Sequence, residues 1–329
     1  CYNGERFLDR YFDAICKQTY DKVEHIIVND ERSTDNSERI CLSWKPRVEK
    51  RGYEFRYVLQ KTYKGVAGAI NEGLPYVTGE FLIWPDCDDT LIPTSIEKRV
   101  EFLNQNSDYA MVRSDYVAVY DEKPDVIIRY GSDRTNVQNE YIFDDLISKK
   151  TFCTPGCYMV RSSALFERIP DGEIYWENGG GQNYQLLLPC SYNHKTGYID
   201  KPLYKYHIRP DSHSHRIDGD EYFSHKRRQV ARREILYHVI SEFHLLSEDE
   251  KADYLTRIEL QFTMRMLDLA LRYNNLEDAK IAMQALDRMN DDPGITSKIL
   301  YLLCRFGVSG YIIKGSSLLR WLSRKAWRC

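Results

Sequence analysis

Residues 80–89 read Glu80-Phe81-Leu82-Ile83-Trp84-Pro85-Asp86-Cys87-Asp88-Asp89, an apolar stretch that runs directly into an acidic loop. A second apolar stretch, 24–29, ends in the same way at Asp30. Open α/β sheets bind ligands at the carboxyl ends of their strands, so we expect these carboxylates along one sheet edge. One carboxylate can hydrogen-bond a nucleobase or ribose, and two separated by one residue can hold a divalent cation at phosphate oxygens. An isolated D-x-D is also typical of a solvated turn or a helix start, but its place beside Asp30 favours a metal site.

Outward from this stretch, short apolar runs alternate with helical patterns. The expected strands are 24–29, 53–60, 80–84 and 109–112, and the expected helices are 5–17, a helix from about 36, 66–76 and 94–106. This alternation is typical of βαβ units around a largely parallel sheet. The predicted fold class is therefore α/β.

The pattern changes further along the chain. Between about 115 and 209, the short strands 126–130 and 203–208 are separated by long polar loops. Three later segments have apolar residues at three- and four-residue spacing, which predicts helices at 224–244, 248–273 and 276–289. A length of 329 residues leaves room for two domains. We predict an α/β domain over residues 1–215 and a helical C-terminal region over 216–329.

The composition is that of an ordinary globular chain. At 43% hydrophobic and 29% charged, it is neither collagen-like nor disordered, and it has no run of 18 apolar residues. Nine scattered cysteines without a C-x-x-C pair favour a reducing cytosol over a zinc ribbon or a disulfide framework. The net charge of −3 combines +7 over residues 293–329 with −10 over the remainder. An acidic body argues against general nucleic-acid binding.

The basic end predicts contact with an anionic partner. On a helix drawn over residues 316–328, one side carries apolar residues, namely Leu318, Leu319, Trp321, Leu322 and Ala326. The other side carries Arg320, Arg324 and Arg328. Such a helix suits the surface of an anionic membrane. The alternative is that it docks on the acidic body of the same protein.

Several segments share the order and spacing of a known family. They are Tyr2-Asn3-Gly4-Glu5, Ile26-Ile27-Val28-Asn29-Asp30, Lys64-Gly65-Val66-Ala67-Gly68, and Thr78-Gly79-Glu80-Phe81 leading into Asp86-Cys87-Asp88-Asp89. Together they resemble the inverting family 2 glycosyltransferases over about residues 1–110, and less closely over 176–183 and 206–212. The resemblance implies a GT-A fold, in which a nucleotide-binding α/β half is joined to an acceptor-binding half.

The resemblance also implies a nucleotide side and a metal ligand. Asp30 would contact the nucleobase, usually uracil, and Asp86 would reach the ribose. Asp88 would ligate Mg²⁺ or Mn²⁺ at the diphosphate. The other candidates for contact with the nucleotide are Tyr2, Asn3 and Lys64. His207 is a second candidate ligand of the metal. A lone histidine in a strand is more often a packed residue than a ligand. His207 could therefore also be a residue packed inside the fold.

Further residues are expected on the acceptor or phosphate side, namely Gly180, Gln182 and Arg209. Glu177 is the candidate catalytic base, because it alone lies in a segment that resembles the base motif of the family. Asp171 and Glu173 are its rivals because they are close in sequence. The glycines at 179–181 let a backbone approach a ligand at a helix start, or form a flexible turn.

The implied activity is metal-dependent, inverting sugar transfer. The donor would be a nucleotide-diphospho-sugar, with UDP-sugars expected, and the acceptor a glycan or lipid-linked molecule in bacterial surface-polysaccharide synthesis. The expected place is the cytoplasm, with peripheral contact at the inner face of the membrane. Two alternatives stay open: a nucleotide-sugar-binding protein without turnover, and a sugar nucleotidyltransferase. The latter needs a Gly-rich loop with Arg and Lys, which is not evident here.

The chain departs from the family pattern in three places. It starts inside the opening motif, so we expect a longer chain with a hydrophobic strand before Tyr2. The loop 30–35 is one residue longer than the usual D-G-S-T-D and has no glycine. Asn178 stands where the family has a second carboxylate, next to Glu177.

Overall fold

A computed structural model describes residues 1–61, 64–169, 171–209, 211–212 and 219–315. The chain divides into two compact units. The first comprises residues 1–146 and 151–215, and the second comprises residues 147–150 and 216–329. The predicted tail helix at 316–328 lies outside the described residues.

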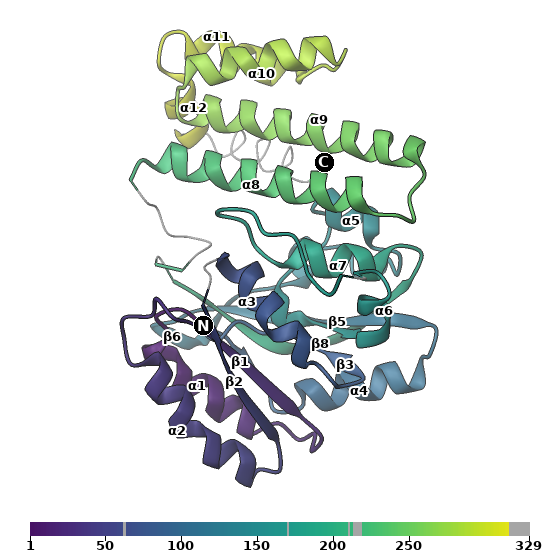
Figure 1. The fold of residues 1–329 in the computed structure, drawn as a ribbon. Helices are drawn as coiled ribbons and strands as arrows, with labels where there is room; N and C mark the ends of the chain where they lie inside the picture. The colour runs from purple at the N-terminus through teal and green to yellow at the C-terminus, as the bar shows by residue number, and fades with distance from the viewer. Residues whose placement is uncertain (62–63, 170, 210, 213–218, 316–329) are drawn as a thin grey trace. The chain divides into compact units, whose positions relative to one another are not determined.

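The first unit begins with a parallel strand pair, β1 (Glu24–Asp30) and β2 (Glu54–Gln60), in register from Glu24 opposite Glu54 to Asp30 opposite Gln60. Three helices accompany it: α1 (Glu5–Cys16), α2 (Ser37–Lys50) and α3 (Gly65–Gly73). Phe12 of α1 packs on Trp44 of α2 and on His25 of β1, whereas Gly73 of α3 approaches Val28. Since neighbouring strand residues point to opposite faces, α3 covers the face opposite α1 and α2 (Figure 1).

His25 is buried in this aromatic layer, with its Nε2 3.1 Å from the Tyr11 hydroxyl. Burial lowers the pKa of His25 to about 4 from 6.5. Above pH 6.5 the imidazole is neutral in both folded and unfolded chains. As the pH falls from 6.5 toward 4, the unfolded chain takes up a proton that the folded chain refuses, so the stability falls.

We expect His25 to make the first unit lose about 3 kcal/mol of stability across this pH range. His25→Gln keeps a polar partner for Tyr11 and does not titrate, so the loss should shrink by about that amount. Urea unfolding followed by tryptophan fluorescence at several pH values measures both chains. An unchanged pH dependence in His25→Gln would contradict the assignment.

The rest of the first unit is built on a mixed sheet with the strand order β3-β7-β5-β8-β4, to which β6 adds through β5. Its strands are β3 (Phe81–Leu82), β4 (Thr90–Leu91), β5 (Tyr109–Tyr120), β6 (Lys123–Tyr130), β7 (Tyr158–Arg161) and β8 (Lys195–Ile208). Its helices are α4 (Ser95–Gln105), α5 (Phe143–Ile147), whose last residue belongs to the second unit, α6 (Ser162–Phe166) and α7 (Asn183–Ser191). Only β5 and β8 pair in parallel among the described strands of this sheet.

The expectation of one largely parallel sheet is therefore wrong: β1 and β2 form a separate parallel pair, and most strands of the larger sheet pair antiparallel. The stretch 80–84 contributes only β3, which pairs antiparallel with β7 instead of joining β1. The predicted strand 109–112 continues to Tyr120 and turns back as β6. Apolar runs indicate that a strand is buried but not which strand it pairs with.

A cavity of about 570 Å³ is lined by residues of β1 and of the β3 region, including Ile26 and Leu82.

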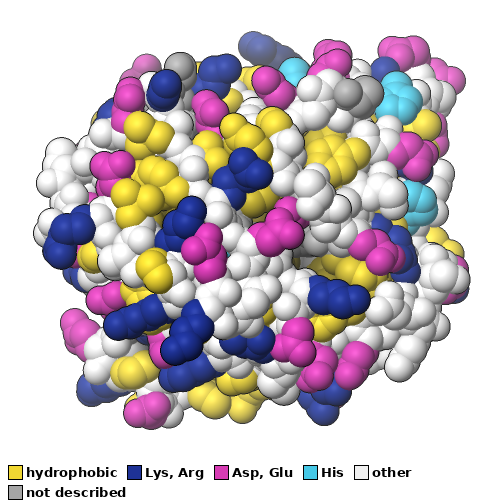
Figure 2. Space-filling view, turned by 60° about the horizontal axis from the view of Figure 1, so that its bottom comes forward, with side chains coloured by type: hydrophobic (Ala, Val, Ile, Leu, Met, Phe, Trp, Pro, Cys, Tyr) yellow, Lys and Arg dark blue, Asp and Glu magenta, His cyan; other side chains and the backbone are white. Residues whose placement is uncertain are grey.

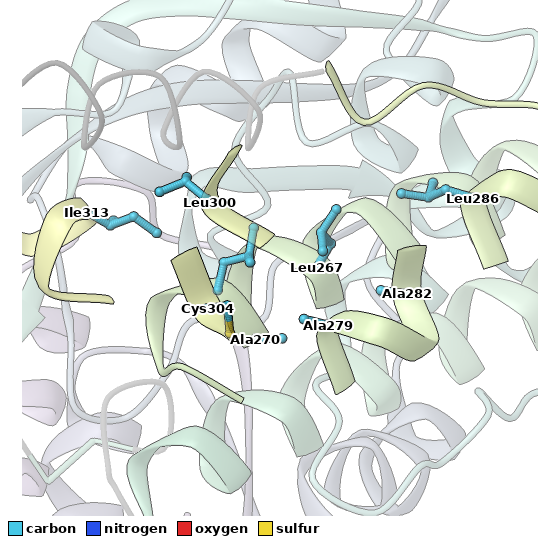
Figure 3. Packing of buried hydrophobic residues seen from close by; sticks show 9 residues of the cluster. Leu267, Ala270, Ala279, Ala282, Leu286, Leu300, Cys304 and Ile313 are labelled. Carbon is cyan, nitrogen blue, oxygen red and sulfur yellow. The ribbon is translucent and has the colours of Figure 1, made fainter. Parts of the chain in front are cut away.

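The second unit is helical, with α8 (Glu221–Glu242), α9 (Glu248–Arg272), α10 (Leu276–Arg288), α11 (Gly294–Cys304) and α12 (Ser309–Gly315). The three helices predicted by the spacing are confirmed. Ser247 and Glu250 form a capping box that fixes the start of α9. Figure 3 shows the core: Leu267, Ala270, Ala279, Ala282, Leu286, Leu300, Cys304 and Ile313, with Leu271. In the described residues, no helix is both long and apolar enough to cross a bilayer.

Candidate active site

The acidic loop 86–89 is fastened to strand β8. Asp89 is buried and accepts hydrogen bonds from the Tyr204 hydroxyl at 2.8 Å and from the backbone N–H of His207 at 2.8 Å. The backbone N–H of Asp89 donates to the carbonyl of Asp86 at 3.2 Å, which closes the turn. Asp89 therefore holds the loop in place, and Asp86 and Asp88 are left half-buried beside it.

Carboxylate oxygens of Asp86, Asp88 and Asp89 lie within 4.8 Å of one another. Burial and the charge of Asp88 raise the pKa of Asp86 to about 7, and the same two causes hold the pKa of Asp89 well above its usual range. Crowded carboxylates repel one another, and a divalent cation relieves that repulsion. Since Mg²⁺ and Mn²⁺ prefer oxygen ligands, this donor set fits the metal that the sequence predicted.

Two arginines face the loop. Arg209, whose side chain is 7% exposed, donates from Nη2 to the Asp88 carboxylate and stacks with its guanidinium carbon 3.9 Å from the Phe7 ring centroid. Arg10 donates to the backbone carbonyl of Asp88 at 2.6 Å and to the Asp121 carboxylate at 2.6 Å. The sequence analysis expected Arg209 on the acceptor or phosphate side, and the structure places it against the acidic loop, whereas Arg10 and Asp121 were missed. They lie far from the loop in sequence, and no local pattern distinguishes them.

His207 is not grouped with the three carboxylates in the described residues. Its Nε2 lies 3.1 Å from the Thr90 hydroxyl, and its Nδ1 lies 3.1 Å from the Asp121 carboxylate. Burial lowers its pKa to about 4. The imidazole is engaged inside the fold, and it is the backbone of His207 that supports the acidic loop.

The second predicted cluster surrounds Asp30 at the end of β1. Asn3 accepts a hydrogen bond from the backbone of Thr34 at 2.8 Å, which brings Tyr2 and Asn3 against the loop. The Asp30 carboxylate accepts hydrogen bonds from Arg32 Nε at 3.0 Å and Nη2 at 2.7 Å. Burial alone would raise the pKa of Asp30, but the hydrogen bonds and charge of Arg32 outweigh it and lower the pKa.

Arg32 was missed by the sequence analysis. It occupies the loop that is one residue longer than the family pattern, and its guanidinium carbon lies 5.3 Å from the Tyr2 ring centroid. A nucleobase that approaches Asp30 would meet this cation. The added residue was visible in the sequence, but its partner was not.

Gly4 joins the two clusters. A Cβ at this position would lie 2.6 Å from Cys1 Sγ and 3.7 Å from Cys87 Sγ, so the backbone of the opening motif packs closely on the acidic loop. The backbone N–H of Asp30 donates to the carbonyl of Cys1 at 2.9 Å. The start of the chain thus contacts both the end of β1 and Cys87 of the acidic loop.

The segment that carries Glu177 is clamped between α3 and α7. Asn71 of α3 exchanges two hydrogen bonds with the backbone of Ile174, at 2.9 and 2.8 Å. Glu177 is half-buried and accepts hydrogen bonds from the Tyr175 hydroxyl at 2.8 Å and from its neighbour Asn178 at 3.0 Å. Its rivals Asp171 and Glu173 are exposed.

The start of α7 ties this segment to the acidic loop. Gln182 hydrogen-bonds the Asp86 carboxylate, and Asn183 accepts from Trp84 Nε1 at 3.0 Å. Gly180 donates its backbone N–H to the carbonyl of Glu177 at 2.9 Å, as in a tight turn. Lys64, directly before α3, is exposed. Gln182, expected on the acceptor or phosphate side, thus contacts the acidic loop at Asp86, whereas Gly180 shapes the Glu177 loop.

The arrangement of sheets, with carboxylates at the ends of β1 and β3 and helices that follow, defines a GT-A fold. The model of the family described as "Glycosyl transferase family 2" matches residues 1–168. The protein belongs to this family, which confirms the resemblance.

Relatives and solved structures agree with this placement. The chain is 28% identical over 176 residues to the uncharacterized glycosyltransferase RT0329 of Rickettsia typhi, covering 51% of this chain and 50% of that protein. It is 29% identical over 163 residues to the putative glycosyltransferase EpsE of Bacillus subtilis, covering 50% and 54%. The chain thus spans about half the length of these curated relatives.

Two solved structures share the fold at low identity. S. aureus TarS 1–349, in complex with UDP-GlcNAc, superposes with a TM-score of 0.57 at 16% identity over 78% of this chain and 69% of that one. The mannosyltransferase PcManGT of Pyrobaculum calidifontis, in complex with GDP-Man and Mn²⁺, gives a TM-score of 0.57 at 14% identity over 99% and 81%.

Proposed function

We propose that the protein transfers a sugar from a nucleotide-diphospho-sugar to an acceptor hydroxyl. The observation that carries the proposal is the acidic cluster of Asp86, Asp88 and Asp89, with Arg209 and Gln182 in contact with it. Crowded carboxylates beside a buried guanidinium suit a cation and a diphosphate together. A UDP-sugar is the proposed donor, and a glycan or lipid-linked molecule of bacterial surface-polysaccharide synthesis is the proposed acceptor.

Each group has a separate task in this reaction. Asp88 would hold Mg²⁺ or Mn²⁺, Asp86 would reach the ribose, and Asp89 keeps the loop in shape. A bound cation would supply positive charge at the departing diphosphate, which makes protonation of the leaving group unnecessary. Glu177 accepts the proton of the attacking acceptor hydroxyl, which gives inversion at the sugar carbon when that hydroxyl attacks from the face opposite the diphosphate.

The experiment that tests this function uses radiolabelled donors with and without Mn²⁺. UDP-GlcNAc and GDP-Man are the first donors to try, because two structural neighbours are complexes with them. Release of free or transferred sugar only in the presence of Mn²⁺ supports the transferase. Tight donor binding without release of sugar supports the alternative of a nucleotide-sugar-binding protein. This alternative arises because Asn178 replaces the second carboxylate of the family, which would allow a loss of turnover.

We also propose that the C-terminal region contacts an anionic membrane. Residues 293–329 have a net charge of +7, and α11 and the turn after it expose an apolar stripe. The stripe consists of Ile295, Ile299, Leu302 and Phe306, of which Ile295 and Phe306 are 76% and 78% exposed. Its spacing places the four side chains on one side of the helix, with the exposed cations Lys298 and Arg305 beside them.

Vesicle co-sedimentation tests the membrane contact. We expect more protein to pellet with anionic than with neutral vesicles at low salt, and salt to reduce the difference. Arg305→Glu together with Ile299→Glu should abolish the difference, whereas Lys201→Glu, an exposed lysine of the first unit, is the matched control. Equal pelleting with both lipids would contradict the proposal.

A further inference from the structure

Arg209 is held against Asp88 by burial and by contacts with Phe7 and Asp211. Its side chain is 7% exposed, its flat face lies on Phe7, and its Nη2 donates to the carboxylate that is proposed to hold the cation. Asp211 lies 3.4 Å from Arg209 Nε. In the donor-free protein, the negative charge of Asp88 is thus already neutralised by a side chain of the same chain.

The same arginine has a buried donor without an acceptor. Among the described residues, Arg209 Nη1 is buried and has no hydrogen-bond partner, whereas Nε, also buried, has only the 3.4 Å ion-pair contact with Asp211. A buried donor without a partner is destabilising, and more so when the group is charged. A guanidinium with free donors on a fixed fork is suited to the paired oxygens of a phosphate. The observation points to an anionic ligand on the far side of the guanidinium.

Asp88 cannot serve a guanidinium and a divalent cation equally well, because two positive charges would then share one carboxylate. We propose that Arg209 is an exchangeable counter-ion, which pairs with Asp88 in the donor-free protein and passes to the diphosphate when cation and nucleotide bind together. This inference rests on the proposed function. The Phe7 ring can remain under the guanidinium throughout, so that a small rotation turns Nη2 from the Asp88 carboxylate toward a phosphate oxygen and gives Nη1 an acceptor as well.

Such an exchange makes the two ligands depend on each other. The cation alone must displace Arg209, and it binds weakly. The nucleotide takes up the displaced Arg209, and each ligand therefore strengthens the binding of the other. A residue that only supports the fold would weaken both ligands when removed, whereas a counter-ion has opposite effects on the two.

Calorimetry with Mn²⁺ alone and with UDP in saturating Mn²⁺ separates these cases. In Arg209→Ala, we expect Mn²⁺ alone to bind about fivefold more tightly or better, and UDP with Mn²⁺ to bind about fivefold more weakly or worse. Arg209→Lys keeps the charge without the fork, so it should leave Mn²⁺ weak and also weaken UDP. Arg6→Ala is the matched control, because Arg6 shares Phe7 and Asp211 but has no contact with Asp88 in the described residues.

The outcomes distinguish the inference from the function on which it rests. If the unaltered protein does not bind UDP with Mn²⁺, the proposed function fails. If it binds UDP but Arg209→Ala binds Mn²⁺ no more tightly, or binds UDP as well as before, the exchange is overturned. Thermal unfolding of each variant, with and without Mn²⁺, shows whether the fold is retained. If the alanine variant unfolds, Arg209→Gln carries the test, because it removes the charge but keeps a long polar side chain and should likewise bind Mn²⁺ more tightly and UDP more weakly.

Discussion

Replacing Glu177 with Gln is expected to lower the turnover number by about 10²-fold or more, while donor binding stays within a few-fold of the unaltered protein. Glutamine keeps an oxygen for the hydrogen bond from Tyr175 but cannot accept the proton of the acceptor hydroxyl. In the proposed function, Asp86 and Asp88 serve the nucleotide and the metal, so they are badly placed for that task. Asn178 cannot take it over, because an amide is not a useful base.

Steady-state rates and donor affinities of Glu177→Gln measure this prediction. The matched controls are Asp171→Asn and Glu173→Gln, which remove exposed carboxylates from the same segment. Both controls should stay close to normal. Near-normal turnover in Glu177→Gln would refute the assignment, and a large loss in Asp171→Asn would transfer the role to that residue.

Asp88→Asn is expected to abolish the Mn²⁺-dependent binding of a nucleoside diphosphate. Even groups that only orient metal ligands are worth about 10- to 100-fold in metal affinity, so loss of a ligand should cost at least about 100-fold. The substitution also frees Arg209 from its ion pair, but the fold should persist, because Asp89 and not Asp88 anchors the loop.

Calorimetry of UDP with Mn²⁺, together with thermal unfolding, checks both parts of this prediction. Asp86→Asn should weaken binding less than Asp88→Asn, because Asp86 is assigned to the ribose. An unchanged diphosphate affinity in Asp88→Asn would rule out this residue as the ligand.

The sequence predicted those parts of the site that are local in the chain. Asp30 and the loop 86–89 each follow an apolar run, and periodicity alone located them. The partner of Asp30 is two residues away, yet the role of Arg32 was missed, because an added residue shows that a loop differs and not how its side chain folds back. The helices of the second unit were predicted because their apolar spacing is long and regular.

Long-range pairings could not be predicted. Arg10 reaches Asp121 and the carbonyl of Asp88 from α1, and nothing near Arg10 in sequence indicates either contact. The same limit applies to β3, whose apolar run gave no information about β7 as its partner. His207 was a candidate metal ligand, but the direction of its ring depends on Thr90 and Asp121, which are distant in sequence.

Strand β8 carries three supports of the acidic loop within a few residues: the Tyr204 hydroxyl, the His207 backbone and, just beyond the strand end, Arg209. Side chains alternate between the faces of a strand, so the insertion or deletion of one residue before Tyr204 would exchange the faces of all that follow. Loops such as 171–181 are free of this constraint. If residues 171–181 face the acceptor, as the proposed function requires, changes of length in this loop would let acceptor preference diverge during evolution while the acidic loop held by β8 is inherited intact.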